Sequence, residues 1–246
     1  MIRISAISYL NSLPFAWCLE HSDIMKEIAL SYDIPSRCAD KLLADEADIG
    51  LIPVVKTLEM PEHYIVSNLC IGAGDTIRTV VLASETSIDN ISTIYLDNHS
   101  RTSVALARIL AKHYWKIEPE WIHFSGDITA YPRAKNSAAV VIGDKVFGLQ
   151  SAHVYDLATE WRKFTGLPFV FACWVANKPI DEGFINRFNE ALNGLFDNMN
   201  AIVEHYKDHA PAEVDLLDYW TNNISYPLTV DKRKGMELFL KYVREM

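Results

Sequence analysis

Residues 48–55, DIGLIPVV, form an almost unbroken apolar run, and runs of this kind limit the fold more than any other feature of the chain. A strand this apolar is suited to burial on both faces, as in a parallel sheet covered by helices. Before it, residues 2–8 and 32–34 resemble short strands. Helices are expected at residues 14–20 and 37–44, the second with Ser36 as its N-cap. Strands and helices that alternate in this way predict a layered α/β fold.

The rest of the chain continues this alternation. Further strands are expected at residues 78–84, 93–97, 138–144 and 168–176, and further helices at residues 100–115, 182–204, 211–221 and 230–245. The strands at 78–84 and 168–176 bracket a middle block of roughly the size of a small domain. This placement favours two lobes with these two strands as crossovers and a ligand cleft between the lobes. A single doubly wound domain is the alternative.

Charge and composition exclude several classes of partner. The 32 acidic and 23 basic residues give a net charge of −9, which argues against a nucleic-acid or anionic-membrane surface. No apolar run reaches the roughly 18 residues of a membrane-spanning helix. The first residues read as a strand rather than a signal peptide, and the four cysteines contain no C-x-x-C pair. We therefore expect a cytoplasmic protein with reduced thiols and no membrane or nucleic-acid partner; the oligomeric state is not predicted.

The sequence contains no complete motif for binding a metal or a dinucleotide. His205 and His209 are four residues apart, but no third ligand and no metalloprotease Glu accompany them, so a solvated helix face is expected. The glycines at 72–74 precede a strand, whereas a dinucleotide-binding loop follows one. These residues therefore give no support for a metal site or a dinucleotide site.

Polar residues follow three of the predicted strands, at residues 9–13, 97–103 and 143–145. Ligands of α/β sheets bind at the carboxyl ends of strands, so these are the candidate site segments. In the second segment a helix begins at Ser100 or Arg101. Its free N–H groups and the hydroxyls of Ser100, Thr102 and Ser103 are suited to a carboxylate or phosphate, although ordinary capping explains the same residues.

The other two segments are ambiguous in the same way. The amide of Asn11 can orient a hydroxyl or a carboxylate without adding charge, and it can equally cap its own turn. Asp144 can act as an acid or base, but Gly-Asp after a strand is also an ordinary turn.

Taken together, the segments ISYLNSLPF, ADIGLIPVV, LDNHSRTSVALARIL, VVIGD and YDLATEWRKFTGLPFVFACWV resemble, in order and spacing, the chorismate dehydratases of the futalosine route to menaquinone. The resemblance implies a two-lobed fold like that of the type II periplasmic binding proteins. It places one lobe at residues 1–82 and 175–246 and the other at residues 83–174. The implied reaction is dehydration of chorismate to 3-[(1-carboxyvinyl)oxy]benzoate, without metal or organic cofactor.

The resemblance also assigns site residues. Asn11 falls on the active-site Asn of the family. The turn expected to hold a substrate carboxylate falls on Ser100, Arg101, Thr102 and Ser103. The remaining substrate-binding residues are expected to be Ser8, Tyr9 and Thr79, the last standing where many members have Ser. The proton acceptor is either the enolpyruvyl carboxylate of the substrate or a protein group, of which Asp144 is the leading candidate.

Two other functions fit the same pattern. A non-catalytic small-anion-binding protein of the solute-binding type would share the fold, since fold alone does not give function. A dihydroxynaphthoate synthase of the same pathway would have a related fold. That family has a His-containing loop after its first strand, where this chain has Tyr9, Leu10 and Asn11.

Overall fold

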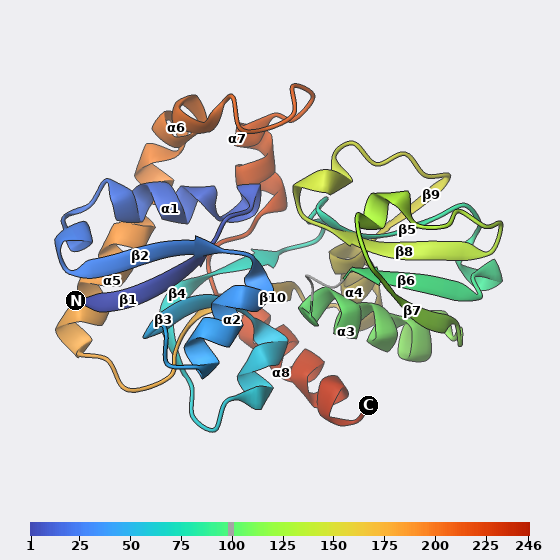
Figure 1. Cartoon of the computed structure of the whole chain (residues 1–246), viewed down its shortest axis with the longest axis horizontal. Helices are drawn as coiled ribbons and strands as arrows, with labels where there is room; N and C mark the ends of the chain where they lie inside the picture. Colours follow the sequence, from blue (N-terminus) through green and yellow to red (C-terminus); the bar gives the residue numbers. More distant parts are fainter. Residues whose placement is uncertain (98–100) are drawn as a thin grey trace.

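The computed structural model describes residues 1–97 and 101–246, which form two five-stranded sheets placed side by side (Figure 1). The first sheet has the order β2-β1-β3-β10-β4, with β1 (Ile2–Ile7), β2 (Ile28–Asp33), β3 (Ile49–Pro53), β4 (Tyr64–Ala73) and β10 (Phe169–Ala176). The second has the order β7-β6-β8-β5-β9, with β5 (Val80–Ser84), β6 (Thr93–Asp97), β7 (Glu120–Phe124), β8 (Ser137–Ile142) and β9 (His153–Asp156).

The two sheets are built to one plan. In the first, β1 pairs in parallel with β2 and β3, and β10 and β4 follow in antiparallel orientation. In the second, β6 pairs in parallel with β7 and β8, and β5 and β9 follow in antiparallel orientation. The predicted two-lobed α/β fold is confirmed.

The chain passes between the sheets at residues 74–79 and returns after α4 (Leu157–Thr165) through residues 166–168. The strands expected to bracket the middle block exist as β5 and β10. Each lies within one sheet, so the short segments before them make the crossings. The division into lobes at 82/83 and 174/175 stays a prediction.

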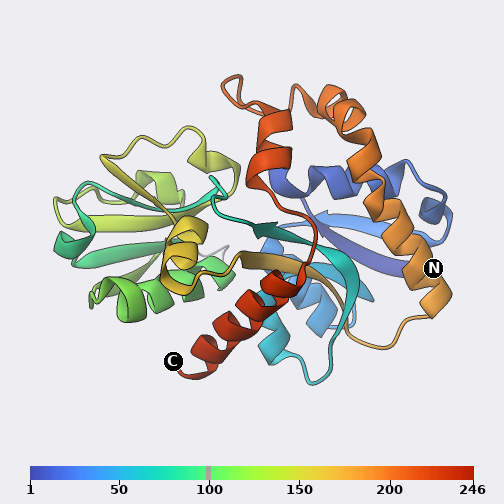
Figure 2. The same cartoon turned by 180° about the vertical axis from the view of Figure 1, so that it is seen from behind.

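Helices cover the sheets on the outside (Figure 2). In the first lobe, α1 (Leu13–Glu20) contacts α5 (Glu182–Asn193) and α6 (Leu195–Tyr206), while α2 (Pro35–Leu43) packs on β1 and β3. The last helix, α8 (Val230–Arg244), contacts β10 of the first sheet and α3 (Arg101–Ile109) of the second lobe. The C-terminal helix therefore spans both parts of the molecule.

The most apolar segments form the centre of the core. Every residue of β3, β5, β8 and β10 is buried, which explains their unbroken apolar sequences. Trp161 and Trp174 are completely buried, and all four cysteines are buried and unpaired. Among the described residues, no helix has the length and apolar character needed to cross a membrane.

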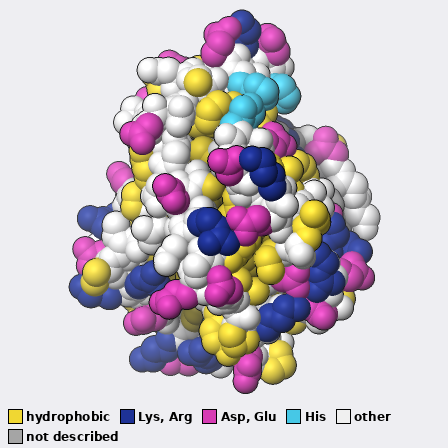
Figure 3. Space-filling model, turned by 90° about the vertical axis from the view of Figure 1, so that its left-hand side faces the viewer, with side chains coloured by type: hydrophobic (Ala, Val, Ile, Leu, Met, Phe, Trp, Pro, Cys, Tyr) yellow, Lys and Arg dark blue, Asp and Glu magenta, His cyan; other side chains and the backbone are white. Residues whose placement is uncertain are grey.

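The molecular surface is mixed in charge. Figure 3 shows acidic and basic side chains interspersed over one face of the molecule, with a small group of His side chains. His205 and His209 are both exposed, as expected of a solvated helix face. Within residues 1–97 and 101–246, no group of three or more His, Cys, Asp or Glu side chains is arranged to hold a metal ion.

Some predicted elements differ from the structure. The helix expected at 182–204 is two helices, α5 and α6, divided at Gly194. The helix expected at 211–221 is only a short α7 (Leu216–Asp218) followed by a π-helical turn. The strands β4, β7 and β9 were not predicted.

One carboxylate holds both ends of the second lobe. Oδ2 of Asp156 accepts hydrogen bonds from the Thr76 hydroxyl at 2.8 Å and from the N–H groups of Ile77 and Arg78 at 3.0 and 2.7 Å. Its Oδ1 caps α4 through two further N–H groups. Arg78 has a φ of 63°, in the left-handed region that non-glycine residues seldom adopt. Asp156 therefore ties the segment that enters the second lobe, at residues 76–78, to the first turn of α4.

The contact of α8 with residues 166–168, where the chain returns to the first sheet, predicts the effect of one substitution. A Cβ atom at Gly235 would lie 2.2 Å from the backbone oxygen of Pro168. In a helix, Ala is more favourable than Gly by about 1 kcal/mol. We nevertheless expect Gly235→Ala to lower the free energy of unfolding by about 1–3 kcal/mol, because α8 has to shift away from the backbone of Pro168 to make room for the methyl group. Urea denaturation measures the change. The control is Glu237→Ala at an exposed position of α8, and equal stability of Gly235→Ala and wild type would contradict the prediction.

Candidate active site

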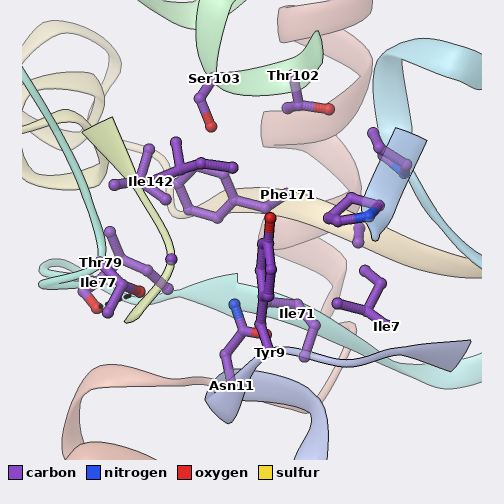
Figure 4. Close-up of a pocket in the computed structure, with 15 residues that line it drawn as sticks. Ile7, Tyr9, Asn11, Ile71, Ile77, Thr79, Thr102, Ser103, Ile142 and Phe171 are labelled. Carbon is purple, nitrogen blue, oxygen red and sulfur yellow. Dashed lines mark hydrogen bonds between the residues drawn. The ribbon is translucent and has the colours of Figure 1, made fainter. Parts of the chain in front are cut away.

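A small cavity of about 60 Å³ lies between the two sheets (Figure 4). It is lined by Ile7, Tyr9, Asn11, Pro35, Pro53, Ile71, Ile77, Thr79, Val80, Thr102, Ser103, Ile142, Gly143, Phe171 and Ala172. Several of these residues end or follow β1, β3 and β8, so the carboxyl ends of strands from both sheets meet here, as in other α/β ligand sites.

The turn after β1 is held by hydrogen bonds on its backbone. The Ser12 hydroxyl contacts the carbonyl oxygens of Ile7 and Tyr9 at 2.7 and 2.9 Å. Trp220 Nε1 donates to the Leu10 carbonyl at 2.8 Å, and the Tyr226 hydroxyl donates to the Asn11 carbonyl at 3.1 Å. These hydrogen bonds, from Ser12 and from two side chains of the C-terminal region, hold the backbone that carries the side chains of residues 9 and 11.

The Asn11 side chain points into the cavity from this support (Figure 4). Its Oδ1 is buried and has no hydrogen-bond partner in the described part of the chain. An unpaired buried amide oxygen costs about 1–3 kcal/mol and is rare in folded proteins. A ligand donor, such as a hydroxyl group, would remove this cost.

Tyr9 stands next to Asn11 and its ring extends across the cavity (Figure 4). Burial raises the pKa of its hydroxyl to about 12, and the carboxylates of Asp97 and Asp144 act in the same direction. The hydroxyl therefore stays protonated at neutral pH and can donate a hydrogen bond to a bound anion.

Thr102 and Ser103 face the cavity from the opposite side, in the first turn of α3 (Figure 4). Both are buried, and the Thr102 hydroxyl accepts a 3.5 Å contact from the Val55 N–H of the first lobe. Arg101 begins the same helix but is exposed and does not line the cavity. Ser100 lies outside the described residues. The two hydroxyls and the positive end of the helix together favour an anionic group at this side.

Thr79 forms part of the cavity wall, at the end of the segment (residues 74–79) that leads from the first sheet to the second. Its hydroxyl lies 2.9 Å from the hydroxyl of Tyr219, a buried side chain from the C-terminal region. The hydrogen bond thus connects the cavity wall to a segment far away in sequence.

Besides Arg101, two other expected site residues do not line the cavity. Ser8 is exposed, and its hydroxyl lies 3.4 Å from the carbonyl of Asp33. Asp144 directs its carboxylate to the N–H of Leu10. Their roles in the reaction stay predictions, as do those of the residues that line the cavity.

The apolar wall of the cavity was not predicted from the sequence. Ile77, Ile142 and Phe171 lie in or beside predicted strands, but only the packing of the two sheets brings them together. The described residues that line the cavity carry no formal charge. The site can therefore hold an apolar ring between neutral hydrogen-bond donors and acceptors.

Fold and cavity define the class: a two-lobed α/β protein with a cavity between its lobes. A solved structure from Archaeoglobus fulgidus matches with a TM-score of 0.71 at 15% identity, covering 99% of this chain and 95% of that one. The periplasmic aliphatic sulphonate-binding protein of Escherichia coli matches with a TM-score of 0.60 at 16% identity, over 99% and 86% of the two chains. The fold is therefore that of the periplasmic binding proteins.

The family follows from the sequence comparison. A family model described as menaquinone biosynthesis matches residues 2–245, and the chain belongs to this family. Similar proteins include a chorismate dehydratase of Thermus thermophilus, 22% identical over 94% of this chain and 91% of the relative. A chorismate dehydratase of Campylobacter jejuni is 21% identical over 96% and 94% of the two chains.

The close packing of Gly143 against the Tyr9 ring predicts the effect of a substitution at Gly143. Gly143 has a φ of 72°, and a Cβ atom there would lie 3.3 Å from the Tyr9 ring. We expect Gly143→Ala to displace this ring and to lower the free energy of unfolding by about 1–2 kcal/mol. Chemical denaturation and a crystal structure of the variant measure the two effects. Gly148→Ala is the control, since a Cβ atom there meets nothing within 4 Å; an unmoved ring in the Gly143 variant would refute the prediction.

Proposed function

We propose that this protein is a chorismate dehydratase, a hydro-lyase that converts chorismate to 3-[(1-carboxyvinyl)oxy]benzoate for menaquinone biosynthesis. The observation that carries the proposal is the unpartnered amide oxygen of Asn11, which faces the hydroxyls of Thr102 and Ser103 across an apolar cavity. Membership of the menaquinone-biosynthesis family and the similarity to two chorismate dehydratases support it.

The chemistry of chorismate sets modest demands on the protein. The proton at C3 is vinylogous to the ring carboxylate, so its removal gives a delocalised anion. Loss of the C4 hydroxyl then yields an aromatic ring, which makes the elimination strongly favourable. The protein has to bind two carboxylates, hold the ring with C3–H and C4–O aligned, and exclude water; position and fixed hydrogen-bond donors provide most of the acceleration.

The lining of the cavity fits these demands. A carboxylate of the substrate binds at the first turn of α3, where Thr102 and Ser103 offer hydroxyls and the helix offers its positive end. The amide of Asn11 and the hydroxyl of Tyr9 contact the polar groups at the other side of the ring. Apolar contacts with side chains such as Ile142 and Phe171 hold the ring itself.

The size of the cavity implies that the lobes move. Its volume of about 60 Å³ is well below the roughly 300 Å³ at which small-molecule pockets begin. The described conformation leaves too little room for chorismate, so the lobes have to separate to admit it and then close around it. Closure then removes water from the reacting atoms, which strengthens the hydrogen bonds made to the substrate.

The proton at C3 passes either to the enolpyruvyl carboxylate of the substrate or to a protein carboxylate. Both routes agree with the proposal, because neither requires a strong base. A cytoplasmic location also belongs to the proposal, as does chorismate as the ligand.

Turnover of chorismate by the purified protein tests the proposal. We expect loss of one water, seen as a new benzoate absorbance and a matching product mass. Asn11→Ala should reduce kcat/KM by at least about 100-fold, the typical effect of removing one fixed hydrogen-bonding group from an active site. The matched control is Asn90→Ala, which removes an exposed amide from the second lobe.

The alternatives give different results. Tight chorismate binding without turnover would indicate a small-anion-binding protein. Absence of both binding and turnover would refute chorismate as the ligand. Equal activity of Asn11→Ala and wild type would show that the site lies elsewhere.

A further inference from the structure

The carboxylate of Asp144 connects the two lobes beside the cavity. Asp144 follows β8 of the second sheet, and both of its oxygens lie 3.2 Å from the backbone nitrogen of Leu10, in the turn after β1 of the first sheet. Leu10 stands between Tyr9 and Asn11, the two polar residues that this turn sends into the cavity.

We propose that Asp144 is a positioning residue, which fixes the Leu10 peptide on closure of the lobes and so aims the side chains of Tyr9 and Asn11 at the substrate. The proposal rests on the proposed function for its kinetic consequences. It replaces the expectation that this carboxylate takes the C3 proton itself.

The other hydrogen bonds of the turn come from a different part of the molecule. The Leu10 and Asn11 carbonyls bind Trp220 and Tyr226, which lie in the C-terminal region that packs on the first lobe. Among the hydrogen bonds that the structure describes for residues 9–12, only the one to Asp144 comes from the second lobe. These two contacts can therefore persist when the lobes separate, whereas the contact with Asp144 requires the lobes to be together.

The residues on either side of Asp144 support the same role. Gly143 packs against the Tyr9 ring, since a Cβ atom at Gly143 would lie 3.3 Å from that ring. Lys145 forms an ion pair with Asp97, the last residue of β6. The end of β8 thus shapes the Asn11 turn and is tied to the strand that leads to α3, so it sets the distance between the two polar sides of the cavity.

The surroundings of the carboxylate disfavour its use as a base. Asp144 is not among the residues that line the cavity, and both of its oxygens face the same N–H. Burial raises the pKa of the carboxyl, while the hydrogen bond from Leu10 acts in the opposite direction. An acceptor in this place can be neutral and still hold the Leu10 N–H.

Two variants separate positioning from proton transfer. Asp144→Asn keeps an acceptor oxygen for the Leu10 N–H but cannot serve as a carboxylate base. Asp144→Ala has neither the acceptor oxygen nor the carboxylate. A positioning role predicts that Asp144→Asn keeps kcat within about threefold of wild type, whereas Asp144→Ala loses at least about tenfold in kcat/KM. A base predicts losses of about 10²–10⁴-fold in both variants.

Hydrogen exchange at the Leu10 amide gives a readout that does not depend on activity. By nuclear magnetic resonance, we expect slow exchange in wild type and in Asp144→Asn, and exchange at least about tenfold faster in Asp144→Ala. The amide of Leu82, in the middle of β5, is the internal control, since its exchange should stay unchanged if Asp144→Ala folds correctly.

The results distinguish a positioning role of Asp144 from a role as the base. Loss of activity in Asp144→Asn by 100-fold or more, or an unchanged Leu10 amide in Asp144→Ala, would overturn the positioning role. If wild type fails to dehydrate chorismate, the proposed function fails, and the exchange rates alone still decide whether Asp144 fixes the Leu10 peptide.

Discussion

The backbone hydrogen bonds of the turn at residues 9–12 are the constraint on which the site depends. They bring together groups from β1, from the end of β8 and from the C-terminal region, so this turn has its shape only when the whole chain is folded. The amide oxygen of Asn11 can remain unpaired and buried because its own backbone is held so firmly. The stability of the rest of the molecule thus compensates for one unsatisfied group in the lining of the cavity.

Under the proposed function, the cavity has to bind an anion without a formal positive charge in its described lining. A chain with a net charge of −9 repels anions over long distances, and the described lining of the cavity offers no formal positive charge. Hydroxyl groups, an amide and a helix N-terminus can bind a carboxylate over short distances once water is excluded. Such a site recognises an anion by geometry, and it is less sensitive to salt than a cluster of lysine or arginine side chains.

Much of the fold could be predicted, because β3, β5, β8 and β10 are buried on both faces and their sequences are apolar throughout. Strands with another environment were missed: β4 is interrupted by Ser67 and Asn68, and β7 and β9 are partly exposed edge strands. Within the site, the turn residues Tyr9 and Asn11 were predictable from their place after a strand and from the family resemblance. The contact between Asp144 and Leu10 was not, because it joins residues 134 positions apart and depends on how the lobes meet.

The common plan of the two sheets has a consequence for how this kind of site can change. β1 and β6 occupy the same place in their sheets, so the turn of Asn11 and the start of α3 are corresponding corners of two similar halves. Under the proposed function, each corner binds a different end of the substrate. Substitutions at one corner can therefore alter recognition of one end while the grip on the other end is retained, which allows ligand preference to diverge in separate steps without rebuilding the scaffold.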